Sequence, residues 1–206
     1  MADDFLAAEE VLPTIKILVV GNGSVGKSSM IRRFCRGAYN ANYKKTIGVE
    51  YLEKEVEVPG FGEVVLMLWD TAGQEEFDAV TQQYYNDTDA VAITFSTDDP
   101  TSLSTIHSWH SKITSSSLTS PPTVVLVQNK IDLSNVSGGV EAKDAEGLAR
   151  SMKVPLYRVS VKDWINVEEM FINLAERHLK KQRDRYMAAA ASTRTVRDTD
   201  AAVKGR

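Results

Sequence analysis

Gly21-Asn22-Gly23-Ser24-Val25-Gly26-Lys27-Ser28 fits the phosphate-loop pattern G-x-x-x-x-G-K-[ST]. An apolar run over residues 15–20 leads into it and predicts a buried strand, and residues 29–34 lead out of it as a helix. Glycines let successive backbone N–H groups turn inward around a polyphosphate, and the start of the helix adds a positive end. The lysine reaches the outer phosphates, and the serine hydroxyl is a magnesium ligand. The residues expected to contact phosphate are Gly21, Gly23, Ser24, Val25, Gly26, Lys27, Ser28 and Ser29.

A glycine-rich turn before a helix matches the same pattern by chance, so composition and the remaining motifs must support it. The chain has 206 residues, 43% of them hydrophobic, which suits one domain of ordinary size plus tails. The net charge of -4 argues against general nucleic-acid binding. One cysteine, Cys35, excludes an internal disulfide and fits a reducing, intracellular setting. No apolar run approaches the roughly 20 residues of a membrane span.

Strand-like and helix-like segments alternate along the chain. Residues 50–58 and 63–69 flank a glycine-containing turn and predict an antiparallel hairpin. Further strands are expected over residues 90–96, 123–128 and 156–159, with helices between them. Because such alternation implies parallel pairing through right-handed crossovers, we expect an α/β fold of the P-loop NTPase type. Its six-stranded, mostly parallel sheet has one antiparallel edge strand and helices on both faces.

The ends of the chain differ from its middle. Residues 1–13 are acidic, end in a proline and predict a flexible lead, and residues 14–183 form the domain. The last helix is expected to start at Asn166, with Glu169 completing a capping box, and to end near Arg185. Residues 184–206 contain few large apolar side chains and are predicted to be disordered.

Asn129-Lys130-Ile131-Asp132 ends a predicted buried strand and carries the chemistry to select a base. One carboxylate, Asp132, can accept both the ring N1–H and the exocyclic amine of guanine. Adenine would leave that carboxylate desolvated and unpaired, so discrimination is strong. Asn129 can tie this loop to its neighbours, and the Lys130 stem can lie over the base. An isolated match would be a surface turn, but this one follows a phosphate loop.

Asp70-Thr71-Ala72-Gly73-Gln74 directly follows the second hairpin strand. An acidic partner for Mg²⁺ is expected at Asp70, acting through water. Gly73 has no side chain, so its N–H can approach a γ-phosphate, and Gln74 can orient an attacking water. Thr46 could supply a second hydroxyl to Mg²⁺ beside Ser28. A helix cap followed by a turn is the plainer alternative, yet all these motifs follow strands, where α/β sheets bind ligands.

These motifs, together with Ser160-Val161-Lys162, stand in the order and approximate spacing of the Ras-like small GTPases, which the chain resembles over residues 14–183. The resemblance implies a GTP/GDP switch that hydrolyses GTP slowly, with Mg²⁺ as cofactor and Gln74 as the catalytic residue. It also implies that Tyr39 stacks beside the guanine. The guanine-binding set is then Tyr39, Asn129, Lys130, Asp132, Ser160, Val161 and Lys162. The family usually has alanine at the position of Val161, a change expected to alter packing more than contacts.

Thr46-Ile47-Gly48-Val49 and the stretch from Leu68 to Glu75 resemble the Rab family within this superfamily. The effector surface implied by that resemblance comprises Ile47, Gly48, Tyr51, Trp69 and Tyr84. Asn22-Gly23, residues 75–79 and residues 127–130 resemble the cilium-associated Rab branch, branch twenty-three. Rab proteins usually end in prenylated cysteines, whereas the only cysteine here is Cys35. Either the chain is truncated or it does not anchor itself by prenylation.

The resemblance further implies a monomer that works with an exchange factor, a GTPase-activating protein and effectors in vesicle, membrane or ciliary trafficking. It implies a cytoplasmic location, peripheral on endomembranes or at the base of a cilium or flagellum. Two alternatives remain open at this point. One is a docking module that binds GTP without meaningful hydrolysis. The other is an adenine-nucleotide P-loop enzyme, against which Asp132 argues.

Overall fold

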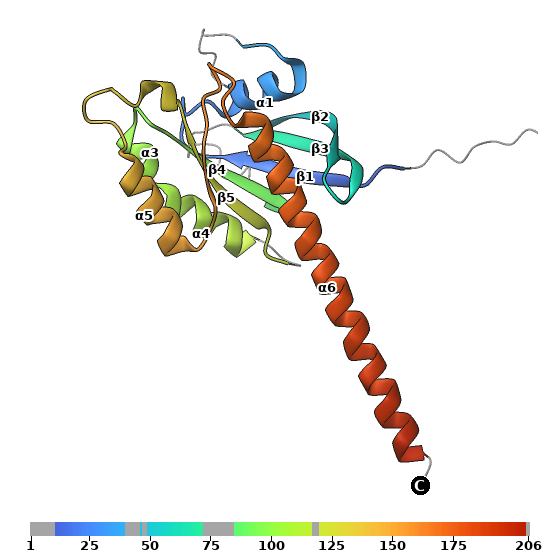
Figure 1. The fold of residues 1–206 in the computed structure, drawn as a ribbon. Coiled ribbons are helices and arrows are strands. Elements are labelled where there is room, and N and C mark those ends of the chain that lie inside the picture. The colour runs from blue at the N-terminus through green and yellow to red at the C-terminus, as the bar shows by residue number, and fades with distance from the viewer. Residues whose placement is uncertain (1–10, 40–45, 47–48, 72–84, 117–119, 205–206) are drawn as a thin grey trace, which may run out of the picture.

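A computed structural model describes residues 11–39, 46, 49–71, 85–116 and 120–204, with backbone alone beyond residue 191. Its elements, in chain order, are β1 Thr14–Val20, α1 Lys27–Arg36, β2 Val49–Val58, β3 Gly62–Thr71, β4 Ala90–Ser96, α3 Pro100–Ser104, α4 Ile106–Ser116, β5 Thr123–Asn129, a 3-10 turn Ile131–Leu133, α5 Ala142–Met152, β6 Leu156–Arg158 and α6 Val167–Lys204. Figure 1 shows them as a sheet with helices packed around it.

The six strands form one sheet in the order β2-β3-β1-β4-β5-β6. Every neighbouring pair is parallel except β2 and β3, which form the predicted hairpin at the edge. The predicted fold class is therefore confirmed. Because the parallel strands all run the same way, their carboxyl ends and the loops after them meet at one edge of the sheet.

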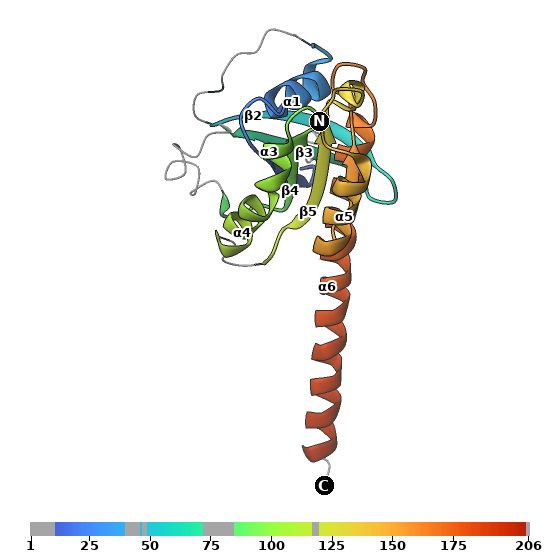
Figure 2. The ribbon, with the colours of Figure 1, turned by 90° about the vertical axis from the view of Figure 1, so that its left-hand side faces the viewer.

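Helices cover both faces of the sheet (Figure 2), and an apolar core lies on each face. Successive residues of β1 point to opposite faces: Ile15, Ile17 and Val19 join α1 and α6 in one core, and Leu18 and Val20 join α4 and α5 in the other. A strand covered on both faces is apolar at most positions, as β1 and β4 are, although Lys16 interrupts β1 and Thr94 interrupts β4. The cores hold β1 and β5 firmly, and these strands carry the phosphate and base motifs.

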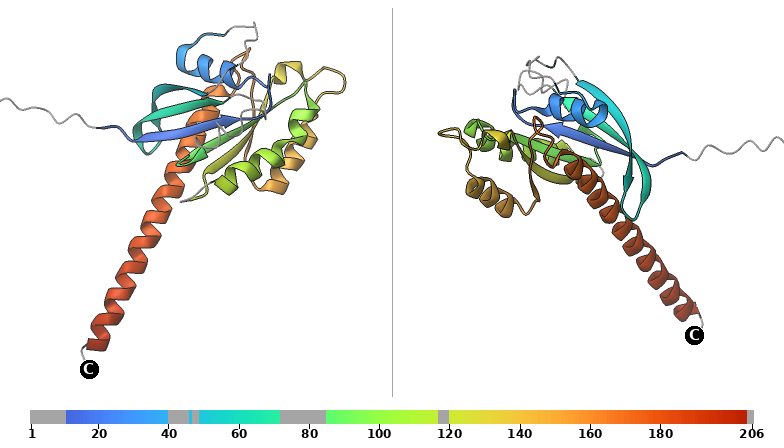
Figure 3. Two further views of the ribbon diagram at one scale, coloured as in Figure 1. Left: turned by 180° about the vertical axis from the view of Figure 1, so that it is seen from behind. Right: turned by 45° about the horizontal axis from the view of Figure 1, so that its top comes forward.

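The helix α6 is longer than the sequence predicts. Its backbone is helical to Lys204, where we expected a helix end near Arg185 and a disordered tail (Figure 3). Tyr186 and Met187 are largely exposed, so packing does not explain the extension. The run of alanines over residues 188–191 has the highest intrinsic helix propensity and favours continuation. The division of the chain at residues 13 and 183 stays a prediction.

The predicted capping box at the start of α6 is wrong. Asn166 has a φ of 56°, in the left-handed region, so its backbone does not adopt the extended conformation of that motif. Its side-chain amide instead donates to the carbonyl of Arg158, at 2.8 Å. The residue thus ties the start of α6 to the end of β6, next to the candidate site.

Candidate functional site

The backbone of the loop between β1 and α1 passes so close to neighbouring strands that two of its positions have no room for a side chain. A Cβ at Gly21, where φ is +137°, would lie 2.0 Å from the carbonyl oxygen of Thr94 on β4. A Cβ at Gly26, where φ is +97°, would lie 2.4 Å from Nδ2 of Asn129 on β5. Ser24 also has a positive φ, of 61°. Such alternation of backbone conformation gathers N–H groups into a concavity for an anion, and α1 begins immediately after it.

Lys27 is the first residue of α1 and is only 5% exposed. Its ammonium group donates to the carbonyls of Gly21 and Asn22, at 2.7 and 2.8 Å, across the loop. Burial lowers the pKa of Lys27 to about 8, an effect that the nearby carboxylate of Asp70 opposes. A cation held inside the loop has the sign that a polyphosphate requires.

Three oxygen-bearing side chains converge beside Lys27. The hydroxyls of Ser28 and Thr46 are 2.7 Å apart, and the Thr46 hydroxyl lies 3.5 Å from Oδ2 of Asp70. Asp70 is 4% exposed, and its Oδ1 has no hydrogen-bond partner among the described residues. Burial raises the pKa of its carboxyl, and the hydrogen bond from Ser28 and the charge of Lys27 oppose that rise.

These three groups fit Mg²⁺, which prefers oxygen ligands and keeps waters or substrate phosphates in its shell. A buried carboxylate oxygen without a partner is costly, and a divalent cation would offset that cost. The described residues contain no group of three or more His, Cys, Asp and Glu side chains able to hold a metal. Hydroxyls, the single carboxylate and the phosphates themselves would therefore have to complete the coordination.

Asn129, at the end of β5, joins the phosphate loop to the predicted base loops. It is 1% exposed, and its Nδ2 donates to the carbonyl of Val25 at 2.8 Å. Its Oδ1 accepts the N–H of Val161 at 3.3 Å. One buried amide thus connects segments that lie 104 residues before it and 32 residues after it.

The two loops expected to bind the base are also joined directly. Oδ1 of Asp132 accepts a hydrogen bond from the hydroxyl of Ser160 at 2.7 Å. Lys130 has a φ of 58°, and its ammonium group pairs with Asp98 at 3.1 Å. Asp132 is not among the buried residues, so its carboxylate keeps room to accept hydrogen bonds from a ligand. The hydrogen bond from Ser160 thereby orients the carboxylate of Asp132.

The predicted effector surface is described only in part. Tyr51 on β2 and Trp69 on β3 are cross-strand partners, with stacked rings 5.1 Å apart. Tyr51 is 51% exposed, which is high for a large aromatic side chain. The predictions for Ile47, Gly48, Gly73, Gln74 and Tyr84 lie outside the described residues.

Most of the other predicted residues lie together at the carboxyl edge of the sheet. Hydrogen bonds join Ser28, Thr46 and Asp70, and the charge of Lys27 acts on the same carboxylate. Other hydrogen bonds join Asn129 to Val25 and Val161, and Ser160 to Asp132. Tyr39 is 43% exposed just beyond the end of α1, and Arg33 connects it to the Ser160–Lys162 loop. Ser29 follows Ser28 in the first turn of α1, and no hydrogen bond of its side chain is described.

Sequence reasoning missed two contacts of this site. Oδ1 of Asn22, inside the phosphate loop, accepts hydrogen bonds from Thr105 and Trp109 at 2.8 and 2.9 Å, so the loop is fastened to α4. Arg33 contacts the loop before α6. The partners are far away in the sequence in both cases, and no local pattern pointed to them.

The sequence model of the Ras family matches residues 16–180, and the fold described above is that of a G domain of this family. The chain therefore belongs to the Ras family and is a GTPase. Because the relatives described below are Rab-type proteins, the chain is, more narrowly, a Rab-like small GTPase. Within the described ranges, every helix is too short or too polar to cross a lipid bilayer.

Three relatives illustrate the similarity. The chain is 33% identical over 173 residues to the Ypt/Rab-type GTPase YPT7 of Saccharomyces cerevisiae, covering 82% of this chain and 83% of that protein. It is 36% identical over 168 residues to the Ras-related protein Rab-30 of Homo sapiens, covering 82% and 81%. It is 38% identical over 161 residues to the Ras-related protein Rab-34 of Homo sapiens, covering 78% and 62%.

Proposed function

We propose that this chain is a Mg²⁺-dependent GTP/GDP switch of membrane trafficking that hydrolyses GTP slowly. The observation that carries the proposal is the side chain of Asn129, which bonds to the phosphate loop through Val25 and to the base loop through Val161. One buried amide holds both ends of a nucleotide crevice in register. The Rab-type relatives support the trafficking role.

The roles follow from the chemistry of each group. Lys27 binds the outer phosphates, and Asp132 accepts the two donors of guanine. Ser28, Thr46 and Asp70 would hold Mg²⁺, which neutralises charge that develops on the phosphates. Gln74 is proposed to orient the attacking water, and the N–H of Gly73 to contact the γ-phosphate. As in Ras, an arginine from a partner would accelerate hydrolysis by up to ~10⁵-fold, or about 7 kcal/mol of barrier.

The finer parts of the proposal rest on the sequence. Exchange factor, activating protein and effectors are expected partners, and the stacked Tyr51 and Trp69 support an effector surface on the β2–β3 hairpin. A peripheral location on endomembranes accords with the Rab-type relatives. A place in the cilium-associated branch rests on short stretches such as Asn22-Gly23 and residues 75–79.

The test is single-turnover hydrolysis of GTP by the purified chain with Mg²⁺, compared with Gln74→Leu. We expect slow hydrolysis by the natural sequence and a clear loss in the variant. Equal rates in the two proteins would remove the water-orienting role of Gln74. Equal competition of ATP and GTP for binding would contradict the role of Asp132, and tight GTP binding without any turnover would favour the docking module.

A further inference from the structure

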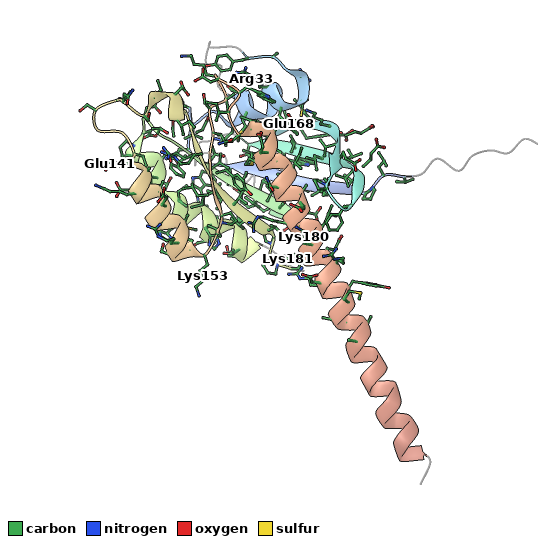
Figure 4. The ribbon with its side chains drawn as sticks, in the orientation of Figure 1. Arg33, Glu141, Lys153, Glu168, Lys180 and Lys181 are labelled. Carbon is green, nitrogen blue, oxygen red and sulfur yellow. The ribbon has the colours of Figure 1, made fainter. Side chains whose placement is uncertain are left out.

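Arg33, in the last turn of α1, lies where three segments meet (Figure 4). Its Nη1 donates to the carbonyls of Val161 and Lys162, in the loop expected to back the base. The centre of its guanidinium group also lies 5.4 Å from the ring of Tyr39 and 5.4 Å from the ring of Trp164. One side chain therefore contacts two of the predicted guanine-binding segments at once.

The chemistry of arginine suits this position. A guanidinium group is planar, so it can donate hydrogen bonds within its plane while aromatic rings contact its faces. The C-terminus of a helix carries partial negative charge, which favours a cation in its last turn. The helix ends here because Gly37 adopts a φ of 67° and its N–H donates to the carbonyl of Arg33 at 2.8 Å. The backbone that carries the guanidinium group is thus fixed.

The loop that Arg33 contacts, which includes Trp164, is also held rigidly. Trp164 has a φ of 60°, a strained conformation for a bulky residue that persists only where the surroundings impose it. Ser160 and Ile165 exchange backbone hydrogen bonds of 3.1 and 2.9 Å and close the loop around it. The Trp164 ring packs against the core beneath α1 and α6. The loop therefore presents Trp164 and the two carbonyls as one rigid unit.

Tyr39 differs from these groups because it is 43% exposed. Among the described contacts, its cation–π interaction with Arg33 is the one that links it to the Ser160–Lys162 loop. Without Arg33, only contacts with the bound nucleotide would keep the ring of Tyr39 beside the base. Removing the cation would therefore weaken the closed arrangement of these segments around a nucleotide.

We propose that Arg33 is a positioning residue that slows the release of guanine nucleotide by clamping Tyr39 to the Ser160–Lys162 loop. The inference rests on the proposed function, because it assumes that these segments enclose a guanine. Arg33 orders groups that would touch the base and does not touch the reacting phosphates. Its effect is therefore expected in retention of the nucleotide and not in the chemical step.

The experiment measures release of a fluorescent GDP from the full chain with Mg²⁺ and excess unlabelled GDP. We expect Arg33→Ala to release it at least about tenfold faster, a change of about 1.4 kcal/mol, with the association rate changed less than about twofold. Arg33→Lys keeps the charge but loses the planar fork, so an intermediate rate is expected. The matched control is Arg36→Ala, an exposed arginine three residues further along α1, and its rate should equal that of the natural sequence.

A second variant separates clamping from general destabilisation. Trp164→Leu keeps an apolar side chain but removes one aromatic face, and we expect release about threefold faster. In the double variant with Arg33→Ala the Trp164 change should add little, because both act through one contact. Denaturant unfolding at saturating GDP should show all variants folded before release is measured.

Two outcomes would overturn the inference while leaving the proposed function in place. One is release from Arg33→Ala within twofold of the natural rate, and the other is an equal acceleration in Arg36→Ala. Failure of the natural sequence itself to retain GDP would instead contradict the proposed function. The three results are distinct in a single series of measurements.

Discussion

Replacing Asn129 by aspartate tests whether one buried amide holds the site together. The substitution keeps the size of the side chain but exchanges the Nδ2 donor for an oxygen. In the structure Nδ2 lies 2.8 Å from the carbonyl oxygen of Val25, so two acceptors would face each other at that distance. Val25 and Asn129 are each 1% exposed, so water cannot easily take the place of the lost donor.

The expected cost follows from these contacts. A buried acceptor left without its donor costs about 1–3 kcal/mol, and the unpaired charge of the new carboxylate adds to it. We therefore expect Asn129→Asp to lose about 3 kcal/mol of stability. For a chain of this size that corresponds to a fall in Tm of about 6–12 °C. The other oxygen still accepts the N–H of Val161, so the base loop should be less affected than the phosphate loop.

The control is Asn173→Asp, which removes a similar amide donor at the surface. Nδ2 of Asn173 donates to the carbonyl of Glu169, also at 2.8 Å, but that bond is exposed on α6. We expect a change within about 0.5 kcal/mol. Both variants are compared with the natural sequence by denaturant unfolding at one saturating concentration of GDP and Mg²⁺, because ligand shifts apparent stability. Equal losses in the two variants would refute the bridging role of Asn129.

Three further predictions concern the base, the core and pH. Asp132→Asn should lower the preference for GTP over ATP by at least about tenfold, because the charged acceptor held by Ser160 is lost. Competition binding measures this preference, and an unchanged ratio of the two affinities would contradict the proposal that Asp132 selects the base. Phe171→Ala should cost about 3–5 kcal/mol in denaturant unfolding, because this fully buried ring packs 4.6 Å from Phe34, and a loss below 1 kcal/mol would contradict that packing. Burial lowers the pKa of His178 below its usual 6.5, although Asp89 opposes this, so the folded protein binds fewer protons than the unfolded chain. The free energy of unfolding should therefore be highest above pH 6.5 and fall as the pH drops below 6.5. His178→Gln should make this decline shallower when unfolding is measured from pH 7.5 to 5.5.

The hairpin and the site motifs show how far local patterns reach. The strands predicted over residues 50–58 and 63–69 are observed as Val49–Val58 and Gly62–Thr71, because alternation and a glycine turn are local signals. The end of α6 was predicted less well. The small side chains after Arg185 indicated disorder through their inability to pack, but the same alanines favour a helix.

Asn166 illustrates the opposite failure. Its spacing from Glu169 matches a capping box, yet its side chain bonds to Arg158, eight residues earlier. The backbone turns through a left-handed conformation at this point, which no local pattern indicated. The preference of asparagine for a cap position was overridden by its contact with the end of β6.

Side-chain periodicity and motif spacing were enough to predict the sheet with helices on both faces, and they also gave the proposals of a phosphate loop and a base-selecting aspartate. These features depend on neighbours within a few positions, so they are visible in the order of residues. The bridge from Asn129 to Val25 and the clamp of Arg33 on Val161 join segments 104 and 128 residues apart. Such contacts exist only once the chain has folded, because hydrogen bonds form between groups that are close in space, whatever their separation along the sequence.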